Sequence, residues 1–289
     1  MRVIMSSFVF VMFLLTRAYS QDTLSMDIVG DRFLIVDAAV NDSIEARFLF
    51  DTGGGLEVVS NRLFRRLDGT AEAVGVITGF RSTGQRVDLE LYRIPSMTVG
   101  TLRKQNLTIA PFPELDGYED FDGILSLKFF ENQAVTLDFS ARKIILESVS
   151  SLKVIKETAE VISIYEKTNS NVELGIMIPL IVNDNLKILA EFDTGTGIEY
   201  MMNPYYLKTI VADTSAIPRN DWTGSDGVVQ RMYLPTVSSM RLENSKLVSG
   251  HNLQVTCLEN FIYQGCVGWQ LFKDRLVTVD CPGKQMLIR

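Results

Sequence analysis

The chain has 289 residues, of which 46% are hydrophobic and 22% are charged, and its formal net charge is −7. A chain of this length can bury the cores of two lobes. It is acidic and has no dense run of Lys and Arg, so it lacks the positive surface needed to bind nucleic-acid phosphates, and no nucleic-acid partner is expected.

Residues 1–20 are predicted to be a secretion signal. Arg2 provides a positive start, Val3–Leu15 is apolar, and Ala18-Tyr19-Ser20 forms a small-x-small cleavage site. The apolar stretch is shorter than the roughly 20 residues that a membrane-spanning helix needs. We therefore expect a secreted or periplasmic protein with no membrane span after signal removal. An uncleaved tether is the alternative.

The sequence predicts many short strands and few helices. Runs rich in Val, Ile, Phe and Thr alternate with turns that contain Gly, Asn, Asp or Pro. The predicted strands are Phe33–Val40, Ile44–Phe50, Val87–Tyr92, Ala134–Phe139, Ile176–Val182, Leu186–Phe192, Gln230–Leu234 and Leu276–Asp280. Short helical turns are expected at Asn61–Leu67, Lys128–Asn132 and Asn203–Ile210, with Asn61 and Asn203 as caps.

The chain contains an internal duplication. The tripeptide Asp-Thr-Gly occurs at residues 51–53 and again at 193–195, an offset of 142 residues. The same offset pairs Val135-Thr136 with Val277-Thr278 near the other end of the repeat. Matches at one fixed offset indicate a duplication rather than chance similarity between two apolar halves.

The duplication predicts two lobes, spanning residues 27–148 and 172–289. The connecting residues 149–171 are polar and mixed, and they are expected to form a linker. Within them, Glu160–Tyr165 alternates enough to add a strand beneath both lobes, and a plain linker is the alternative.

All three cysteines, Cys257, Cys266 and Cys281, lie in the second repeat. Their counterparts in the first repeat are all apolar: Leu115, Ile124 and Phe139. This favours buried thiols that act as small hydrophobic side chains. One disulfide with a leftover thiol is the alternative, which an oxidising compartment permits. The only histidine is His251, and no spacing fits a metal motif, so no metal is expected.

Asp51 and Asp193 each follow a short apolar run and precede a glycine-containing turn. Gly53 and Gly195 allow the backbone to fold back, so that amide hydrogens point at the carboxylates. If the repeats are related by a pseudo-twofold axis, the two carboxylates meet at that axis. Two carboxylates in contact cannot both ionise readily, so they share one proton and suit general acid and base chemistry.

Two pairs of motifs resemble the aspartic protease superfamily, which includes pepsin-like and retropepsin-like enzymes. Phe50–Gly54 and Phe192–Thr196 look like its two active-site loops, and Phe121–Ser126 and Gly265–Gly268 look like its hydrophobic-hydrophobic-Gly motifs. The stretch from Phe129 to Asp138 is most similar to bacterial retropepsin-like domains. The resemblance implies an all-β fold of two homologous retropepsin-like β-barrel lobes, related by a pseudo-twofold axis, with a few short helices.

The resemblance also implies roles for individual residues. Asp51 and Asp193 would be catalytic, and Thr52 and Thr194 would cross-link the two loops through hydroxyl-to-backbone hydrogen bonds. The residues that support the active-site loops are expected to be Thr52, Gly53, Thr194, Gly195 and Thr196. Asp138 and Asp280, at equivalent strand ends, are interpreted as structural, and Asp122 is interpreted as part of a turn.

The sequence departs from the family pattern in two places. Gly54 stands where Ser or Ala is usual, whereas Thr196 in the second loop keeps a hydroxyl. We expect this hydroxyl to give Asp193 an extra hydrogen-bond donor and to make Asp193 the ionised partner more often. Ser126 replaces the usual Gly of the first hydrophobic motif, whereas Gly268 keeps it in the second.

A flap over the cleft is expected at Thr78–Gly84, a turn-rich tip between two apolar strands. A plain surface hairpin is the alternative, and the segment lacks the Tyr of pepsin-like flaps. Thr223–Gly227 could form a second flap. The predicted substrate-binding residues of the first flap are Gly79, Phe80, Ser82, Thr83 and Gly84.

These observations predict an exported aspartic endopeptidase that hydrolyses peptide bonds with a water activated by the Asp51/Asp193 pair. Its partner would be a peptide or protein substrate, and we expect a monomer. No cofactor is implied, because water is the nucleophile. The alternative is a non-catalytic peptide-binding or sensor protein that retains the fold, which Gly54, Ser126 and the Tyr-free flap favour.

Overall fold

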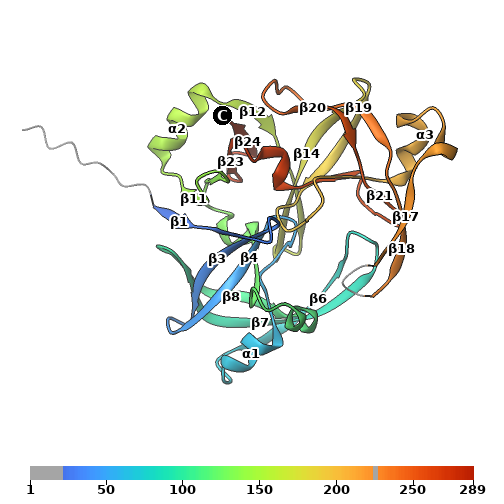
Figure 1. Ribbon diagram of the computed structural model, residues 1–289. Helices are drawn as coiled ribbons and strands as arrows, with labels where there is room; N and C mark the ends of the chain where they lie inside the picture. Colours follow the sequence, from blue (N-terminus) through green and yellow to red (C-terminus); the bar gives the residue numbers. More distant parts are fainter. Residues whose placement is uncertain (1–21, 224–226) are drawn as a thin grey trace, which may run out of the picture.

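The computed structural model describes residues 22–223 and 227–289 (Figure 1). The predicted secretion signal and most of the predicted second flap lie outside the described residues. The described chain consists mostly of strands with a few short helices, so the all-β prediction is confirmed.

The N-terminal half forms an eight-stranded sheet, in which β3 also pairs with β7 and so gives the sheet a barrel-like closure. In sheet order, the strands are β2 (Asp27–Val29), β3 (Phe33–Val40), β4 (Ile44–Asp51), β9 (Gly123–Ser126), β5 (Val58–Val59), β8 (Leu102–Pro111), β7 (Arg86–Val99) and β6 (Glu72–Phe80). Its helices are α1 (Asn61–Arg66) and the 3₁₀ helices η1 (Pro113–Gly117) and η2 (Leu127–Phe130).

The C-terminal half contains a seven-stranded and a three-stranded sheet. The first comprises β16 (Tyr200–Met202), β22 (Gly265–Val267), β15 (Leu186–Phe192), β14 (Glu173–Val182), β19 (Thr236–Leu242) and β20 (Ser249–Gln254), with β13 (Tyr165–Asn169) paired to β14. The second comprises β17 (Arg219–Thr223), β18 (Val229–Tyr233) and β21 (Cys257–Leu258). The helices are η3 (Pro204–Tyr206), α3 (Leu207–Ile210), η4 (Thr214–Ala216) and η5 (Trp269–Phe272).

A six-stranded sheet joins the two halves (Figure 1). In sheet order, it comprises β1 (Thr23–Ser25), β11 (Lys143–Leu146), β10 (Val135–Asp138), β23 (Leu276–Asp280), β24 (Gln285–Ile288) and β12 (Glu160–Ser163). At its centre, Thr136 of β10 lies opposite Thr278 of β23, and their buried hydroxyls are 2.6 Å apart. These residues are 142 positions apart, so the pseudo-twofold axis of the duplication passes between them.

The segment expected as a linker, residues 149–171, consists largely of regular structure. It contains the helix α2 (Val149–Thr158), which the sequence analysis missed, followed by β12 and β13. The side chain of Ser148 caps α2, and within the helix only Ile155 is buried. Because β12 pairs with β24, the strand alternative for this part of the segment was the correct one.

Two caps illustrate how closely the helical turns follow the sequence. The side chain of Ser60 accepts the Leu63 amide at 3.1 Å, so Ser60 caps α1 and the choice of Asn61 was wrong by one residue. Asn203 accepts the Tyr205 amide at 2.9 Å and begins η3 as predicted.

The cysteines are buried and free. Cys257 and Cys266 are 0% and 1% exposed, and Cys281 is 3% exposed. The interpretation as small buried hydrophobic side chains is therefore confirmed, and the alternative of a disulfide is not.

Candidate active site

Each Asp-Thr-Gly loop is held by a buried strand. Asp51 ends β4 and Asp193 directly follows β15, and the phenylalanine before each of them is fully buried. The rings of Phe50 and Phe192 contact those of Phe130 and Phe272 edge to face, at centroid distances of 5.9 and 5.2 Å. β4 and β15 also pair in parallel with β9 and β22, which carry the hydrophobic motifs. The same packing therefore fixes both loops.

The two loops are cross-linked by four buried hydrogen bonds. The hydroxyl of Thr52 donates to the Phe192 carbonyl at 2.6 Å, and that of Thr194 donates to the Phe50 carbonyl at 2.7 Å. Each threonine hydroxyl also accepts the amide of the other threonine at 3.1 Å. The structure thus contains the hydroxyl-to-backbone links that the family resemblance implies, and they bring Asp51 and Asp193 together.

The two glycines after the aspartates are required by this close approach. A Cβ on Gly53 would lie 2.6 Å from the carboxylate carbon of Asp193, and one on Gly195 would lie 2.3 Å from that of Asp51. The Gly53 and Gly195 amides donate to the Oδ1 of Asp51 and Asp193 at 2.8 and 2.9 Å. Each loop therefore supports its own carboxylate while passing directly against the opposite one.

The two carboxyl groups line the same cavity and are partly accessible to solvent. Burial raises the pKa of Asp51 well above its usual value, and the negative charge of Asp193 raises it further. Burial also raises the pKa of Asp193, but hydrogen bonds from Asp51 and from the Gly195 and Thr196 amides oppose this rise. Oδ1 of Asp193 accepts two backbone amides and Oδ1 of Asp51 accepts one, which favours Asp193 as the ionised member and Asp51 as the member that holds the proton.

The asymmetry between the two aspartates has a different origin from the one expected. The backbone amide of Thr196 donates to Oδ1 of Asp193 at 3.0 Å, whereas its hydroxyl accepts the Ile198 amide at 3.2 Å. The Gly54 amide donates to the backbone carbonyl of Asp51 at 3.3 Å. Assigning the extra donor to the Thr196 hydroxyl was wrong, because the loop backbone supplies it.

Replacing Thr196 with Val is therefore expected to leave the acidic limb of a pH–rate profile for peptide cleavage unchanged, because the backbone amide remains. The free energy of unfolding should fall by about 1 kcal/mol, since the Ile198 amide loses its acceptor. The pH profile and urea unfolding of the variant and the parent protein test this. A clear shift of the acidic limb would show that the hydroxyl does act on Asp193.

Ser126, which replaces the usual glycine, has a buried partner. It lies beside Asp51 in the β4–β9 register, and its hydroxyl donates to Oε1 of Glu57 at 2.9 Å. The Ser126 hydroxyl oxygen also accepts the Lys128 amide at 3.1 Å. Glu57 is 1% exposed, and burial raises its pKa to about 7, against the opposing effect of the Ser126 hydrogen bond. The departure at Ser126 is therefore accommodated within the core.

Glu57 makes stability dependent on pH. Its folded-state pKa of about 7 lies above the ordinary 4.5, so its contribution is fully present below pH 4.5 and lost as the pH rises through 7. Replacing Glu57 with Gln should remove about 3 kcal/mol of the fall in unfolding free energy over this range. Urea unfolding of both proteins at pH 4.5 and 8 measures the difference. An equal fall in the free energy of unfolding between pH 4.5 and pH 8 in the two proteins would contradict the raised pKa of Glu57.

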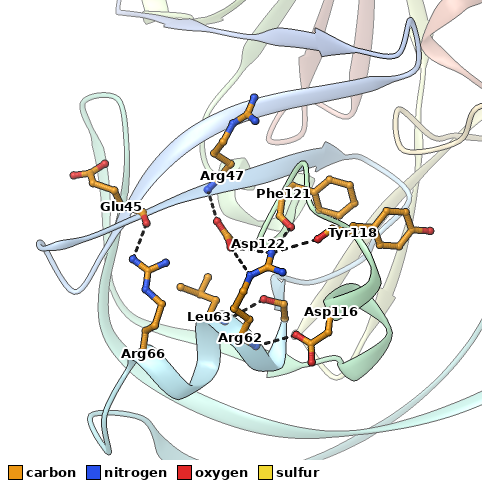
Figure 2. A network of polar contacts seen from close by, with 10 residues as sticks. Glu45, Arg47, Arg62, Leu63, Arg66, Asp116, Tyr118, Phe121 and Asp122 are labelled. Carbon is orange, nitrogen blue, oxygen red and sulfur yellow. Dashed lines mark hydrogen bonds and ion pairs between the residues drawn. The ribbon is translucent and has the colours of Figure 1, made fainter.

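A polar network anchors the hydrophobic motif of the first lobe (Figure 2). The carboxylate of Asp122 accepts the Arg47 amide and the Arg62 guanidinium, both at 3.1 Å. Arg62 also donates to the carbonyls of Tyr118 and Phe121 at 3.3 and 3.2 Å. Asp122 thus ties α1 and β4 to the start of β9, a role wider than the turn expected of it.

The aspartate pair opens into a cavity of about 570 Å³. The hairpin of β6 and β7 contributes Gly79, Phe80 and Ser82 to its lining, whereas Thr83 and Gly84 lie outside it in the described chain. The Ser82 carbonyl accepts the Ile262 amide at 2.9 Å, so the hairpin reaches the C-terminal lobe beside this cavity. The position of the hairpin is that of the predicted flap.

The sequence analysis missed a polar cluster in the same cavity. Lys167 on β13 forms an ion pair with Glu191, and it donates to the Tyr263 hydroxyl at 3.0 Å. Glu191 is 3% exposed; burial raises its pKa to about 7, although Lys167 opposes the rise. Leu49 is the counterpart of Glu191 in the first repeat. The sequence did contain a signal for this cluster, because Glu191 is a charged residue in an otherwise apolar run, two positions before Asp193.

The described residues contain neither a cluster of metal-binding side chains nor a membrane-spanning helix. No group of three or more His, Cys, Asp or Glu side chains in residues 22–223 and 227–289 could hold a metal ion. Over the same residues, no helix has the length and apolar character to cross a membrane.

Fold and site together define a two-lobed protein with paired Asp-Thr-Gly loops between its lobes. Residues 36–129 match a family model described as "Aspartyl protease". A similar solved structure is titled "Crystal structure of Basic 7S globulin from soybean", with 11% identity, 92% of this chain and 94% of that chain covered, and a TM-score of 0.55. No curated protein matched in sequence. Residues 36–129 are thus similar to the aspartyl protease family, and the chain as a whole has the fold of that solved structure.

Proposed function

We propose that the protein is an aspartic endopeptidase in which Asp51 and Asp193 activate a water molecule to hydrolyse peptide bonds. The observation that carries the proposal is the cross-link between the two loops, which brings both carboxyl groups into one cavity. A pair that shares one proton offers a general base and a general acid on the same side of a bound peptide. Export through residues 1–20, to a secreted or periplasmic location, is part of the proposal.

In the proposed reaction, Asp193 takes a proton from water, and the water oxygen attacks the peptide carbonyl carbon. Asp51 gives its proton to the carbonyl oxygen, which forms a neutral tetrahedral intermediate. Asp193 then passes its proton to the amide nitrogen, while Asp51 recovers one from a hydroxyl of the intermediate. The carbon–nitrogen bond breaks, an acid and an amine leave, and the pair again holds one proton.

Digestion of a peptide library tests this proposal. The mature protein, without residues 1–20, is incubated with the library from acid to neutral pH, with and without a statine-type inhibitor. We expect internal cleavage that is favoured by acid pH and blocked by the inhibitor, because the statine hydroxyl mimics the tetrahedral intermediate. Absence of cleavage over the whole pH range would contradict the proposal.

A non-catalytic peptide-binding protein is the second candidate. It is favoured by Gly54, whose amide donates to the Asp51 backbone and not to its carboxylate, so that one carboxylate has fewer donors than the other. This candidate predicts saturable binding of library peptides without any hydrolysis. Mass spectrometry of the bound and free peptides in the same digest distinguishes the two functions.

A further inference from the structure

The cavity around the aspartate pair has two chemically different walls. The N-terminal lobe contributes mainly apolar side chains, namely Leu56, Val58, Val87, Leu89, Phe112 and Ile124. The C-terminal half contributes mainly polar ones, including Lys167, Glu173, Glu191 and Tyr263. A peptide lying across the pair would therefore meet an apolar surface on one side and a polar surface on the other.

The cations of the cavity are already neutralised. Lys167 pairs with Glu191 and also donates to the Tyr263 hydroxyl. Burial lowers the pKa of Lys167, but the negative charge of Glu191 outweighs this effect and raises the pKa above its ordinary value. Arg81 pairs with Glu114, outside the cavity lining. An acidic substrate side chain would have to draw Lys167 away and leave the buried Glu191 carboxylate unpaired, which is costly.

Glu173 is different, because its carboxylate has no partner. It is partly buried, it lines the cavity, and no ion pair or side-chain hydrogen bond engages it within residues 22–223 and 227–289. A Cβ on Gly55 would lie 3.6 Å from its Cβ, and one on Gly79 would lie 3.5 Å from its Oε1. The side chain therefore stands between the first active-site loop and the flap hairpin.

The backbone on both sides of Glu173 is fixed. The Leu174 amide donates to the Gly55 carbonyl at 2.8 Å, which ties the start of β14 to the first active-site loop. The Asn169 side chain, at the end of β13, donates to the Thr78 carbonyl at 3.4 Å. The carboxylate is thus presented by a hairpin that touches both the loop and the flap, and its position does not depend on a bound ligand.

We propose that Glu173 determines specificity, by selecting substrates with a Lys or Arg side chain close to the scissile bond. This inference rests on the proposed function of the site. A partly buried carboxylate without a partner gains most from a cation that donates hydrogen bonds to it. The apolar wall would accommodate an apolar residue on the other side of the scissile bond.

The test compares matched peptides that carry Lys, norleucine or Glu at each position flanking a known cleavage site. We expect the Lys peptide to be cleaved with kcat/KM about 10-fold above norleucine at one position, the effect of one charged hydrogen bond. Glu173→Gln should abolish this preference by lowering kcat/KM of the Lys peptide to that of the norleucine peptide, and Glu173→Lys should transfer the preference to the Glu peptide. The matched control is Glu72→Gln, an exposed carboxylate outside the cavity lining.

A binding measurement separates this inference from the proposed function. Calorimetric titration of Asp51→Asn protein with the same peptides, with and without Glu173→Gln, does not depend on hydrolysis. Tighter binding of the Lys peptide, lost with Glu173→Gln, supports the inference even if the protein cleaves nothing. The inference is overturned if cleavage shows no preference for Lys, or if the preference survives Glu173→Gln. It is also overturned if the Lys peptide does not bind, or binds no more tightly than the others.

Discussion

Replacing either Asp51 or Asp193 with Asn is expected to reduce kcat/KM for peptide cleavage by about 10⁴-fold. The reaction needs one carboxylate to take a proton and one carboxylic acid to donate a proton, and an amide can do neither. The two single variants should lose similar amounts, and the double variant little more, because the pair acts as a unit. Initial rates with one peptide substrate measure the loss.

The control for this prediction is Asp37→Asn. The Asp37 side chain is 84% exposed and lies outside the cavity lining. This variant should cleave at the parental rate. Asp51→Asn should also remain folded, and it should be at least as stable near neutral pH, since burial and the neighbouring carboxylate disfavour the ionised form of Asp51. Cleavage that survives in both single variants would remove the basis for an aspartic protease mechanism.

Replacing Thr52 with Val is expected to lower the free energy of unfolding by about 2–5 kcal/mol, because two buried groups lose their partners. The Phe192 carbonyl would lack its donor, and the Thr194 amide would lack its acceptor. Valine has nearly the shape of threonine, so little of the effect should come from packing. Urea unfolding at a pH where the protein is most stable measures the change.

Thr52→Ser is the matched control, since it keeps the hydroxyl and removes only a methyl group. It should retain most of the stability that Thr52→Val loses, and it should retain cleavage. Thr52→Val should also impair cleavage, because the cross-link between the loops positions the two aspartates. Equal stability of the Val and Ser variants would show that the cross-link contributes little to the fold.

A buried carboxylate makes the stability of the protein depend on pH. Burial raises the pKa of Glu57 to about 7, so the contribution of Glu57 to stability is present below the ordinary pKa of 4.5 and declines as the pH rises through 7. Glu191 differs, because its ion pair with Lys167 opposes the rise that burial produces. The direction at Glu57 suits a protein that is proposed to work in acid, where this group remains neutral.

Much of the fold could be predicted from local sequence. β3, β15 and β23 begin and end at the predicted residues, because apolar β-branched runs with turn residues on either side leave little choice of structure. The duplication predicted more than the strands did. Its constant offset paired Thr136 with Thr278, which the structure places at the centre of the shared sheet.

The connection between the lobes was the least predictable part. α2 buries a single residue, although Val149, Leu152 and Ile155 recur at helical spacing in a segment that was expected to be a linker. β13 pairs with β14, yet in sequence it reads as part of a polar linker. Lys167 and Glu173, which face the cavity from this region, therefore carried no sequence signal of their position.

The sequence by itself determined the superfamily resemblance, the two-lobed all-β fold and the pairing of Asp51 with Asp193, because these depend on a repeated motif and on short apolar runs. Tertiary structure alone decided which atoms surround the pair. The donor from Thr196 proved to be a backbone amide, and Lys167 meets Tyr263 across 96 residues of chain. Such contacts depend on the path and orientation of the backbone, which residue types and spacing do not specify.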